Sequence, residues 1–213
     1  MAGPGASGQN NRSRKASIHR KTKETDISVE LNLDGTGDSS ISTPVGFFTH
    51  MLENLARHGR FDLTVKAEGD LHVDQHHLLE DCGIVLGQAF NKALGNKMGI
   101  NRAGFFVYPM DEALAVVAVD FGGRPFLQYD AKFKRRLCGD LDTDLLQDFC
   151  QALAAGMGAN LVVRMQIGRS DHHKIEAIFK AMAKALQMAC SVDSRLLEYI
   201  PSTKGAIGDD SDH

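Results

Sequence analysis

The sequence predicts an α+β fold made of two similar halves, and three observations lead to this prediction. Several segments alternate apolar and polar residues, which is typical of half-buried strands, while others repeat apolar residues every three or four positions, which is typical of helices. These segments follow one another in the same order in both halves of the chain. A motif of two histidines and a glutamate, HHxxE, begins at His76 and again at His172, 96 residues later. Together these features indicate an internal duplication.

The first half is expected to begin with a strand, because every second residue from 27 to 33 is apolar. A DGTG turn follows this strand, and Pro44 introduces a helix whose apolar residues share one face. A longer helix is expected to end at Gly95, since glycine favours helix termination. The elements expected are strands over 27–33, 39–42 and 61–67, a helix that includes 48–55, and a helix over 76–94.

The second half repeats this order of elements. Strands are expected first, one of them after a Gly-Gly-Arg-Pro turn, and then a helix, a strand and a final helix. An antiparallel or mixed sheet with two helices packed on one face is therefore expected in each half. The expected strands cover 105–108, 113–121, 124–130 and 161–167, and the expected helices cover 144–156 and 172–190. The chain is accordingly divided into a flexible tail over 1–16, half-repeats over 17–101 and 102–204, and a second flexible tail over 205–213.

The composition is that of an ordinary globular protein, since 43% of the 213 residues are apolar and 24% are charged. A net charge of −3 gives no support for a nucleic-acid or membrane partner, and no apolar run reaches the roughly 20 residues of a membrane helix. The N-terminus lacks the apolar segment of a secretory signal. The four cysteines are far apart and lack CxxC spacing, which indicates reduced thiols in a cytoplasmic protein.

The duplicated HHxxE motif is the strongest indication of chemistry. On a helix, Glu80 follows His77 and His76 by three and four residues, so the carboxylate and an imidazole share one face. The two adjacent histidines point about 100° apart, so the economical arrangement has two metal ions, each bound by one imidazole of each motif. Imidazole and carboxylate without thiolate suit Mn²⁺, Fe²⁺ or Zn²⁺, and six-coordination favours Mn²⁺. A single motif would be weak evidence for a metal, because helix-start histidines with a glutamate cap give the same pattern. The candidate ligands are His76, His77, Glu80, His172, His173 and Glu176.

The repeat also predicts a further ligand in each half. His50 lies 26 residues before His76 on the preceding helix, and Asp148 lies 24 residues before His172. Because a carboxylate can replace an imidazole as a ligand of a hard divalent ion, Asp148 is the candidate counterpart of His50. For His50 alone, a surface or capping role is an open alternative.

Three cationic residues lie in turns that suit an anion. Arg102 in GINRAG, Arg124 in GGRP and Lys204 in PSTKG each have glycine or proline nearby. Backbone amides near glycine, together with a guanidinium, form a cradle for phosphate, and Ser202 and Thr203 would add hydroxyl donors. Each cation taken singly could also be a solvated surface charge.

From about Thr22 to Ile207, the chain resembles the imidazoleglycerol-phosphate dehydratase family. The matching segments are TKETDISVELNLDGTG, GFFTHML, GDLHVDQHHLLED, GINRAG, YPMDEALA, GGRP, DHHKIEAIFKA and PSTKG. The resemblance implies a duplicated fold like the second domain of ribosomal protein S5, assembled into a homo-oligomer of 24 subunits with octahedral symmetry. It also implies elimination of water from imidazoleglycerol phosphate in histidine biosynthesis, with two Mn²⁺ ions per site at subunit interfaces.

The resemblance also assigns roles to single residues. The metal ligands that it implies are His50, His76, His77, Glu80, His172, His173 and Glu176, to which the internal repeat adds Asp148. The substrate contacts that it implies are Arg102, Arg124, Ser202 and Lys204 for the phosphate, with Asn54 and Lys180 in addition. Glu24, Glu80 and Glu176 are the candidate catalytic carboxylates. Glu24 matches an acid–base position of the family, and the choice between Glu176 and Glu24 for this role stays open.

The chain departs from the family pattern near these motifs. Thr49 stands where the family usually has Asp before the HML segment, and threonine cannot supply the charge that orients a ligand imidazole. Asn54 replaces a frequent Gln, and Asp148 stands where the family often has His. These departures bear on metal affinity and metal preference more than on the reaction.

In the reaction that the resemblance implies, the metal ions hold the substrate ring as an imidazolate, which expels the adjacent hydroxyl group. A base then removes a proton from the next carbon, and the resulting enol becomes the ketone. The residues alone leave three alternatives open. They are a binuclear metal phosphohydrolase, a metal-storage or metal-stapled assembly protein, and an S5-like nucleic-acid module, against which the mild acidity argues.

Overall fold

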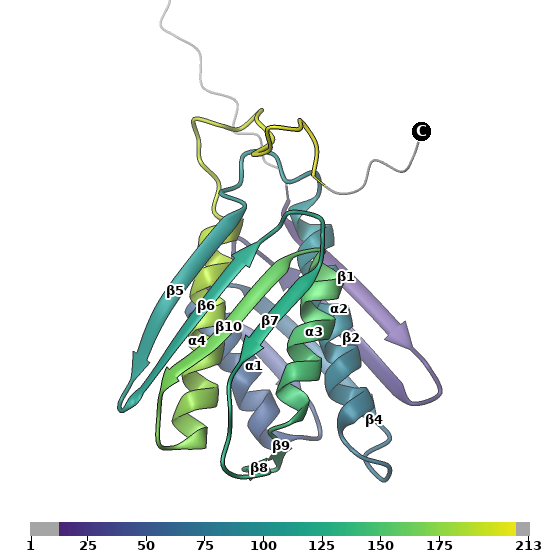
Figure 1. The fold of residues 1–213 in the computed structure, drawn as a ribbon. Coiled ribbons are helices and arrows are strands. Elements are labelled where there is room, and N and C mark those ends of the chain that lie inside the picture. Colours follow the sequence, from purple (N-terminus) through teal and green to yellow (C-terminus); the bar gives the residue numbers. More distant parts are fainter. Residues whose placement is uncertain (1–12, 208–213) are drawn as a thin grey trace, which may run out of the picture.

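The computed structural model describes residues 13–207, and its helices lie between two four-stranded sheets (Figure 1). The first half contains β1 (Lys15–Lys21), β2 (Thr25–Asn32), β3 (Ser39–Ser42), α1 (Gly46–Gly59), β4 (Asp62–Gly69) and α2 (His76–Leu94). The second half contains β5 (Ala103–Met110), β6 (Ala113–Asp120), β7 (Phe126–Asp130), β8 (Leu137–Cys138), β9 (Leu141–Asp142), α3 (Leu145–Met157), β10 (Asn160–Ile167) and α4 (Asp171–Cys190).

Both four-stranded sheets have the same topology, with the order β1-β2-β4-β3 in the first half and β5-β6-β10-β7 in the second. In each sheet, the first two neighbouring pairs are antiparallel and the last pair is parallel. This agreement confirms the predicted α+β class and the duplication. The short β8–β9 hairpin has no counterpart in the described part of the first half.

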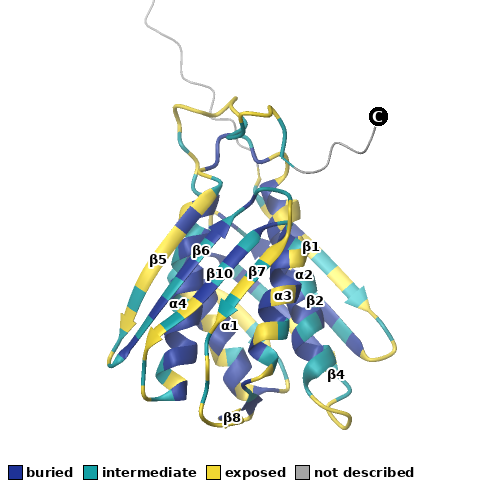
Figure 2. Ribbon diagram, viewed as in Figure 1, coloured by how far each residue is buried: buried dark blue, intermediate teal, exposed yellow. Residues whose placement is uncertain are grey.

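The two halves share one hydrophobic core, because the helices of each half pack against those of the other. α1 lies against α4 and α2 against α3, while α4 covers β5 and β6, and α2 covers β1 and β2. Strand residues that face the helices are buried, and the outward residues are half-buried or exposed (Figure 2). Phe149 of α3 joins the halves, with its ring centroid 5.3 Å from that of Phe48 and 5.7 Å from that of Phe179. Among residues 13–207, no helix is long and apolar enough to span a membrane.

Glycines allow a close approach between α2 and α3. A Cβ atom at Gly87 would lie 2.6 Å from the carbonyl oxygen of Leu153, and one at Gly156 would lie 2.6 Å from that of Ile84. A Cβ atom at Gly83 would likewise come too close to the α3 backbone. Side chains are excluded at these points, so the two backbones set the distance between the functional residues that α2 and α3 carry.

β1 is the main element that the apolar pattern did not predict. It begins at Lys15, inside the segment 1–16 that was expected to be a tail. Its inward positions include Ala16, Ile18 and Arg20, and the charge of Arg20 interrupts the apolar alternation. Arg20 pairs with the buried Asp81 of α2, which explains a guanidinium on this face.

The structure also contains short strands that were not predicted, and some predicted elements begin at other residues. β8 and β9 were not expected, because strands of two residues carry no alternating pattern. β7 begins at Phe126, two residues after the expected start at Arg124. The expected tails also include residues 1–12 and 208–213, which lie outside the described residues.

Candidate active site

The two HHxxE motifs lie at the N-terminal ends of α2 and α4, as the sequence predicts. His76 is the first residue of α2, and its backbone N–H donates to the Asp74 carboxylate at 2.7 Å. At α4 the hydroxyl of Ser170 accepts from the backbone N–H of His173. Local hydrogen bonds therefore fix both helix starts and the positions of the histidines on them.

His50, His172 and Glu176 form one group of possible metal ligands, whose nitrogen and oxygen atoms lie within 4.8 Å of one another. His172 Nε2 lies 3.3 Å from Glu176 Oε2, one helical turn further along α4. Asn54 contacts His50, with Nδ2 3.2 Å from Nε2, and Lys180 Nζ lies 2.7 Å from Glu176 Oε1. Burial acts to raise the pKa of Glu176, but the hydrogen bond and charge of Lys180, together with the charges of His50 and His172, outweigh it and lower that pKa. Glu176 is therefore an ionised carboxylate in this group.

A matching arrangement occurs where α2 meets α3. His76 Nδ1 lies 3.7 Å from an oxygen of Asp148, and His76 Nε2 lies 3.8 Å from an oxygen of Glu80. Asp148 therefore stands beside His76 as His50 stands beside His172, in agreement with the position that the internal repeat predicted. In the described part of the chain, no group of three possible ligands within 4.8 Å combines residues of both motifs.

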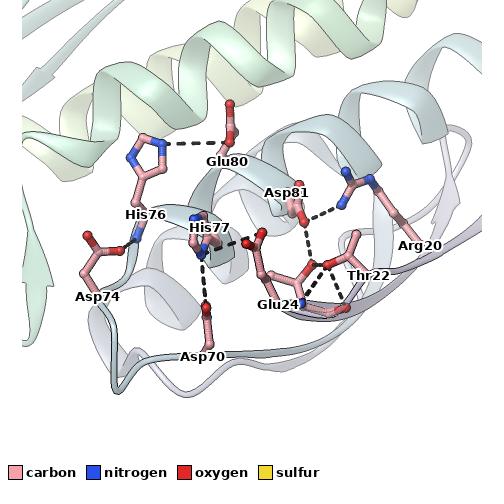
Figure 3. Close-up of polar contacts among 10 residues, drawn as sticks. Arg20, Thr22, Glu24, Asp70, Asp74, His76, His77, Glu80 and Asp81 are labelled. Carbon is pink, nitrogen blue, oxygen red and sulfur yellow. Dashed lines mark hydrogen bonds and ion pairs between the residues drawn. The ribbon is translucent and has the colours of Figure 1, made fainter.

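The second histidine of each motif contacts other carboxylates. His77 Nδ1 lies 3.1 Å from Asp70 and 3.9 Å from Glu24 (Figure 3), and His173 Nδ1 lies 2.7 Å from Glu112. The hydrogen bond to Asp70 raises the pKa of His77, and the hydrogen bond to Glu112 raises that of His173. The same bond from His173 lowers the pKa of Glu112 to about 2. Neither Asp70 nor Glu112 was among the site residues expected from the sequence.

The four residues expected to bind phosphate line a single pocket of about 270 Å³. Asp120 fixes Arg102 there with two hydrogen bonds of 2.7 and 3.1 Å, and the carbonyl oxygen of Pro201 accepts a third of 2.8 Å. Three cations and hydroxyl groups suit a phosphate, because charge-assisted hydrogen bonds are the strong ones. The lining residues are Arg102, Gly122, Arg124, Ser202, Thr203, Lys204 and Ala206.

This cationic pocket lies far from the HHxxE motif on α4 of the same chain. The backbone N–H of Arg102 donates to the carbonyl oxygen of Ala189 near the end of α4, whereas His172 lies in the first turn. The 17 residues between them (189 − 172) correspond to about 25 Å of helix. In Figure 1 the yellow C-terminal segment accordingly lies at one end of α4, and the helix begins at the other. A small molecule in the pocket cannot reach these histidines within one chain.

Comparisons with known proteins agree with the predicted resemblance. The family model for imidazoleglycerol-phosphate dehydratase matches residues 43–186. Over 194 residues, the chain is 56% identical to the imidazoleglycerol-phosphate dehydratase of Koribacter versatilis, and this match covers 91% of this chain and 100% of that one. Over 195 residues, it is 54% identical to the enzyme of Acidiphilium cryptum, covering 92% of this chain and 100% of that one.

Two solved structures have the same fold. Imidazoleglycerol-phosphate dehydratase from Staphylococcus aureus matches with a TM-score of 0.76 and 34% identity, over 84% of this chain and 99% of that chain. The enzyme from Pyrococcus furiosus, solved in complex with (S)-C348, matches with a TM-score of 0.77 and 35% identity, over 89% and 100%.

The duplicated α+β fold, with histidine–carboxylate groups at one end and a cationic pocket at the other, defines an enzyme class that acts on a phosphorylated small molecule. The chain belongs to the imidazoleglycerol-phosphate dehydratase family. It is a hydro-lyase of histidine biosynthesis, so the phosphohydrolase, metal-storage and nucleic-acid alternatives are set aside.

Proposed function

We propose that this dehydratase uses two Mn²⁺ ions per site and shares each site between copies of the chain in an assembly of 24 subunits. Its reaction converts D-erythro-imidazoleglycerol phosphate to imidazoleacetol phosphate. The observation that carries the proposal is the separation of about 25 Å between the α4 histidines and the phosphate pocket of one chain. A neighbouring copy can supply the pocket that these histidines lack.

The candidate ligands fit a divalent ion such as Mn²⁺. They are imidazole nitrogens and carboxylate oxygens, whereas the four cysteines are buried elsewhere as free thiols. Reduced thiols also fit the proposed cytoplasmic location. When bound, the two ions supply Lewis-acid stabilisation of negative charge on the imidazole ring of the substrate. The ligands that we assign are His50, His76, His77, Glu80, Asp148, His172, His173 and Glu176.

We assign the acid–base step to Glu24. Glu176 is buried and held by both Lys180 and His172, which suits a metal ligand. Glu80 is more exposed, but it lies 3.8 Å from His76 at the same i,i+4 spacing, which also suits a ligand. The side chain of Glu24 is 55% exposed and lies 3.9 Å from His77. A carboxylate that is free to approach the substrate can take the proton from the carbon next to the one that loses its hydroxyl group.

The substrate is oriented by its phosphate. Arg102, Arg124, Ser202 and Lys204 of a neighbouring copy hold this group, so that the imidazole ring is directed at the metal ligands. Asn54 and Lys180 contact His50 and Glu176 instead, and we assign them to the part of the substrate between ring and phosphate.

The outer face of the second sheet supports an assembly. Its exposed apolar residues include Phe105 and Phe126, whose exposed fractions are 61% and 59%. Apolar surface of this kind is typical of a contact with another subunit. The corresponding face of the first sheet carries polar residues such as Lys15, Ser17 and Glu30.

The test is turnover of imidazoleglycerol phosphate by chelator-stripped protein, with and without added Mn²⁺, while light scattering reports the size of the assembly. We expect ketone formation that depends on the metal and leaves the phosphate ester intact. Turnover without any divalent metal would contradict the metal assignment. Full activity of a single subunit would contradict the shared site.

A further inference from the structure

The second histidine of each HHxxE motif has its Nδ1 occupied by a carboxylate, and the two halves supply this carboxylate from different places. In the first half it is Asp70, in the loop between β4 and α2, 3.1 Å from His77. In the second half it is Glu112, in the turn between β5 and β6, 2.7 Å from His173. Both halves therefore have a carboxylate at Nδ1 of the second histidine, but the carboxylate comes from a different loop in each half.

Glu24 occupies the position in the first half that corresponds to Glu112 in the second. The β1–β2 turn and the β5–β6 turn each join the first two strands of a four-stranded sheet, and both strand pairs are antiparallel. Each turn directs a carboxylate towards the second histidine of its own half. Glu24, however, stands 3.9 Å from His77 Nδ1, which is beyond hydrogen-bond distance.

The two partner carboxylates are held more firmly than Glu24, Glu112 by backbone hydrogen bonds and Asp70 by burial. One oxygen of Glu112 accepts from the backbone N–H groups of Ser170 at 2.7 Å and Arg169 at 3.3 Å, which leaves the other oxygen for His173. The Asp70 side chain is only 16% exposed, against 55% for Glu24. A rigid carboxylate suits the orientation of a ring, and a mobile one suits proton transfer.

An ionised carboxylate can only accept hydrogen bonds, so the ring nitrogen that faces it has to carry the proton. In a neutral imidazole the other nitrogen is then free to bind a metal ion. For His77 and His173 the protonated nitrogen is Nδ1 and the free nitrogen is Nε2. Both oxygens of Glu112 are engaged, one by backbone N–H groups and the other by His173 Nδ1, which argues against Glu112 as a metal ligand in the group of Asp111, Glu112 and His173. Asp111 lies 3.7 Å from His173 Nε2, the nitrogen that this contact leaves free.

We propose that Asp70 and Glu112 are positioning residues that fix the rings of His77 and His173, so that Nε2 of each ring binds metal. Because Asp70 has this role in the first half, Glu24 is free for proton transfer, whereas its counterpart Glu112 is not. The inference rests on the proposed roles of the two histidines and Glu24. It adds two residues to the site and explains why the repeated turns have different functions.

The test measures Mn²⁺ binding to chelator-stripped full-length protein from the electron paramagnetic resonance signal of free Mn²⁺, independently of turnover. Asp70→Asn and Glu112→Gln keep the side-chain size but can turn an amide N–H towards Nδ1. Each is expected to weaken Mn²⁺ binding roughly 10- to 100-fold, with most of kcat returning at saturating Mn²⁺. Glu24→Gln is expected to keep the Mn²⁺ affinity and lose turnover at every Mn²⁺ concentration.

Glu68→Gln is the matched control, because Glu68 is exposed on β4 two residues before Asp70, and it is expected to change neither quantity. Asp70→Glu and Glu112→Asp retain the charge and are expected to recover part of the lost affinity, which separates orientation from a folding defect. Unchanged Mn²⁺ affinity in Asp70→Asn and Glu112→Gln would overturn the inference. Loss of Mn²⁺ affinity in Glu24→Gln would overturn the division of roles. If the unmodified protein bound no Mn²⁺, the proposed function itself would fail, which is a separate result.

Discussion

Substitution of Gly87 tests how the fold sets the distance between α2 and α3. A Cβ atom at this position would lie 2.6 Å from the carbonyl oxygen of Leu153, and 2.8 Å from both the Gly156 Cα and the Met157 nitrogen. All these atoms belong to the α3 backbone, so no rotation of a side chain can relieve the contacts. Gly87→Ala therefore has to move α2 away from α3.

Two effects of opposite sign decide the change in stability. Alanine favours a helix over glycine by about 1 kcal/mol, whereas overpacking of a core contact costs about 1–3 kcal/mol or more. Because three backbone atoms lie within 3.0 Å of the added Cβ, the cost is at or above the top of that range. A net loss of about 2 kcal/mol follows, which at roughly 2–4 °C per kcal/mol lowers the unfolding midpoint by about 4–8 °C.

The assay is thermal unfolding at equal protein concentration, with Gln88→Ala as the control because Gln88 is the exposed neighbour of Gly87 on α2. The control should change the free energy of unfolding by less than about 0.5 kcal/mol. Since α2 carries His76 and α3 carries Asp148, Gly87→Ala should also lower the affinity for Mn²⁺. An unchanged or raised midpoint for Gly87→Ala would refute the reasoning, because helix propensity alone would then decide the outcome.

Three other outcomes concern the site. Asp148→Ala should lower the Mn²⁺ affinity of stripped protein roughly tenfold or more, measured by equilibrium dialysis, and an unchanged affinity would remove Asp148 from the ligand set. Arg124→Ala should raise KM roughly tenfold without affecting Mn²⁺ binding, because a hydrogen bond to a charged group contributes about 1.5–3 kcal/mol. If steady-state kinetics showed an unchanged KM for this variant, the phosphate contact would be excluded. The Mn²⁺ affinity should fall as the pH is lowered. Because the pKa values of His77 and His173 are raised above 6.5, protons begin to compete with the metal for these rings at a pH above 6.5, and the competition grows as the pH falls. A Mn²⁺ affinity that stays constant as the pH is lowered through 6.5 would contradict a ligand role for these rings.

Much of the fold could be predicted because apolar spacing is a local property of the chain. β2 and β6 alternate buried residues with partly buried or exposed ones along their whole length, as their sequences indicate. β1 could not be predicted in this way, since Arg20 occupies an inward position. Its guanidinium is stabilised there by Asp81, which lies 61 residues away in the sequence.

The same limit applies to the site. Asp148 could be placed near His76 because the duplication gives it the position of His50, and a repeat is visible in the sequence. Asp70 and Glu112 could not be predicted, because each acts through side-chain contacts between a loop and a helix start, which leave no pattern in the sequence. The spacing of the motifs also does not show which way α4 runs. Its direction places the cationic pocket at one end of the helix and the histidines at the other.

The central claim is that one site takes its metal ligands and its phosphate pocket from different chains. Co-assembly of His172→Ala subunits with Arg102→Ala subunits tests this claim directly, because each variant alone lacks one part of every site. In a shared site, an intact motif from one subunit can meet an intact pocket from the other. Random mixing of equal amounts should then restore about a quarter of the turnover of the unmodified protein. If a single chain supplied both parts, every site in the mixture would keep one defect and the mixture would stay inactive.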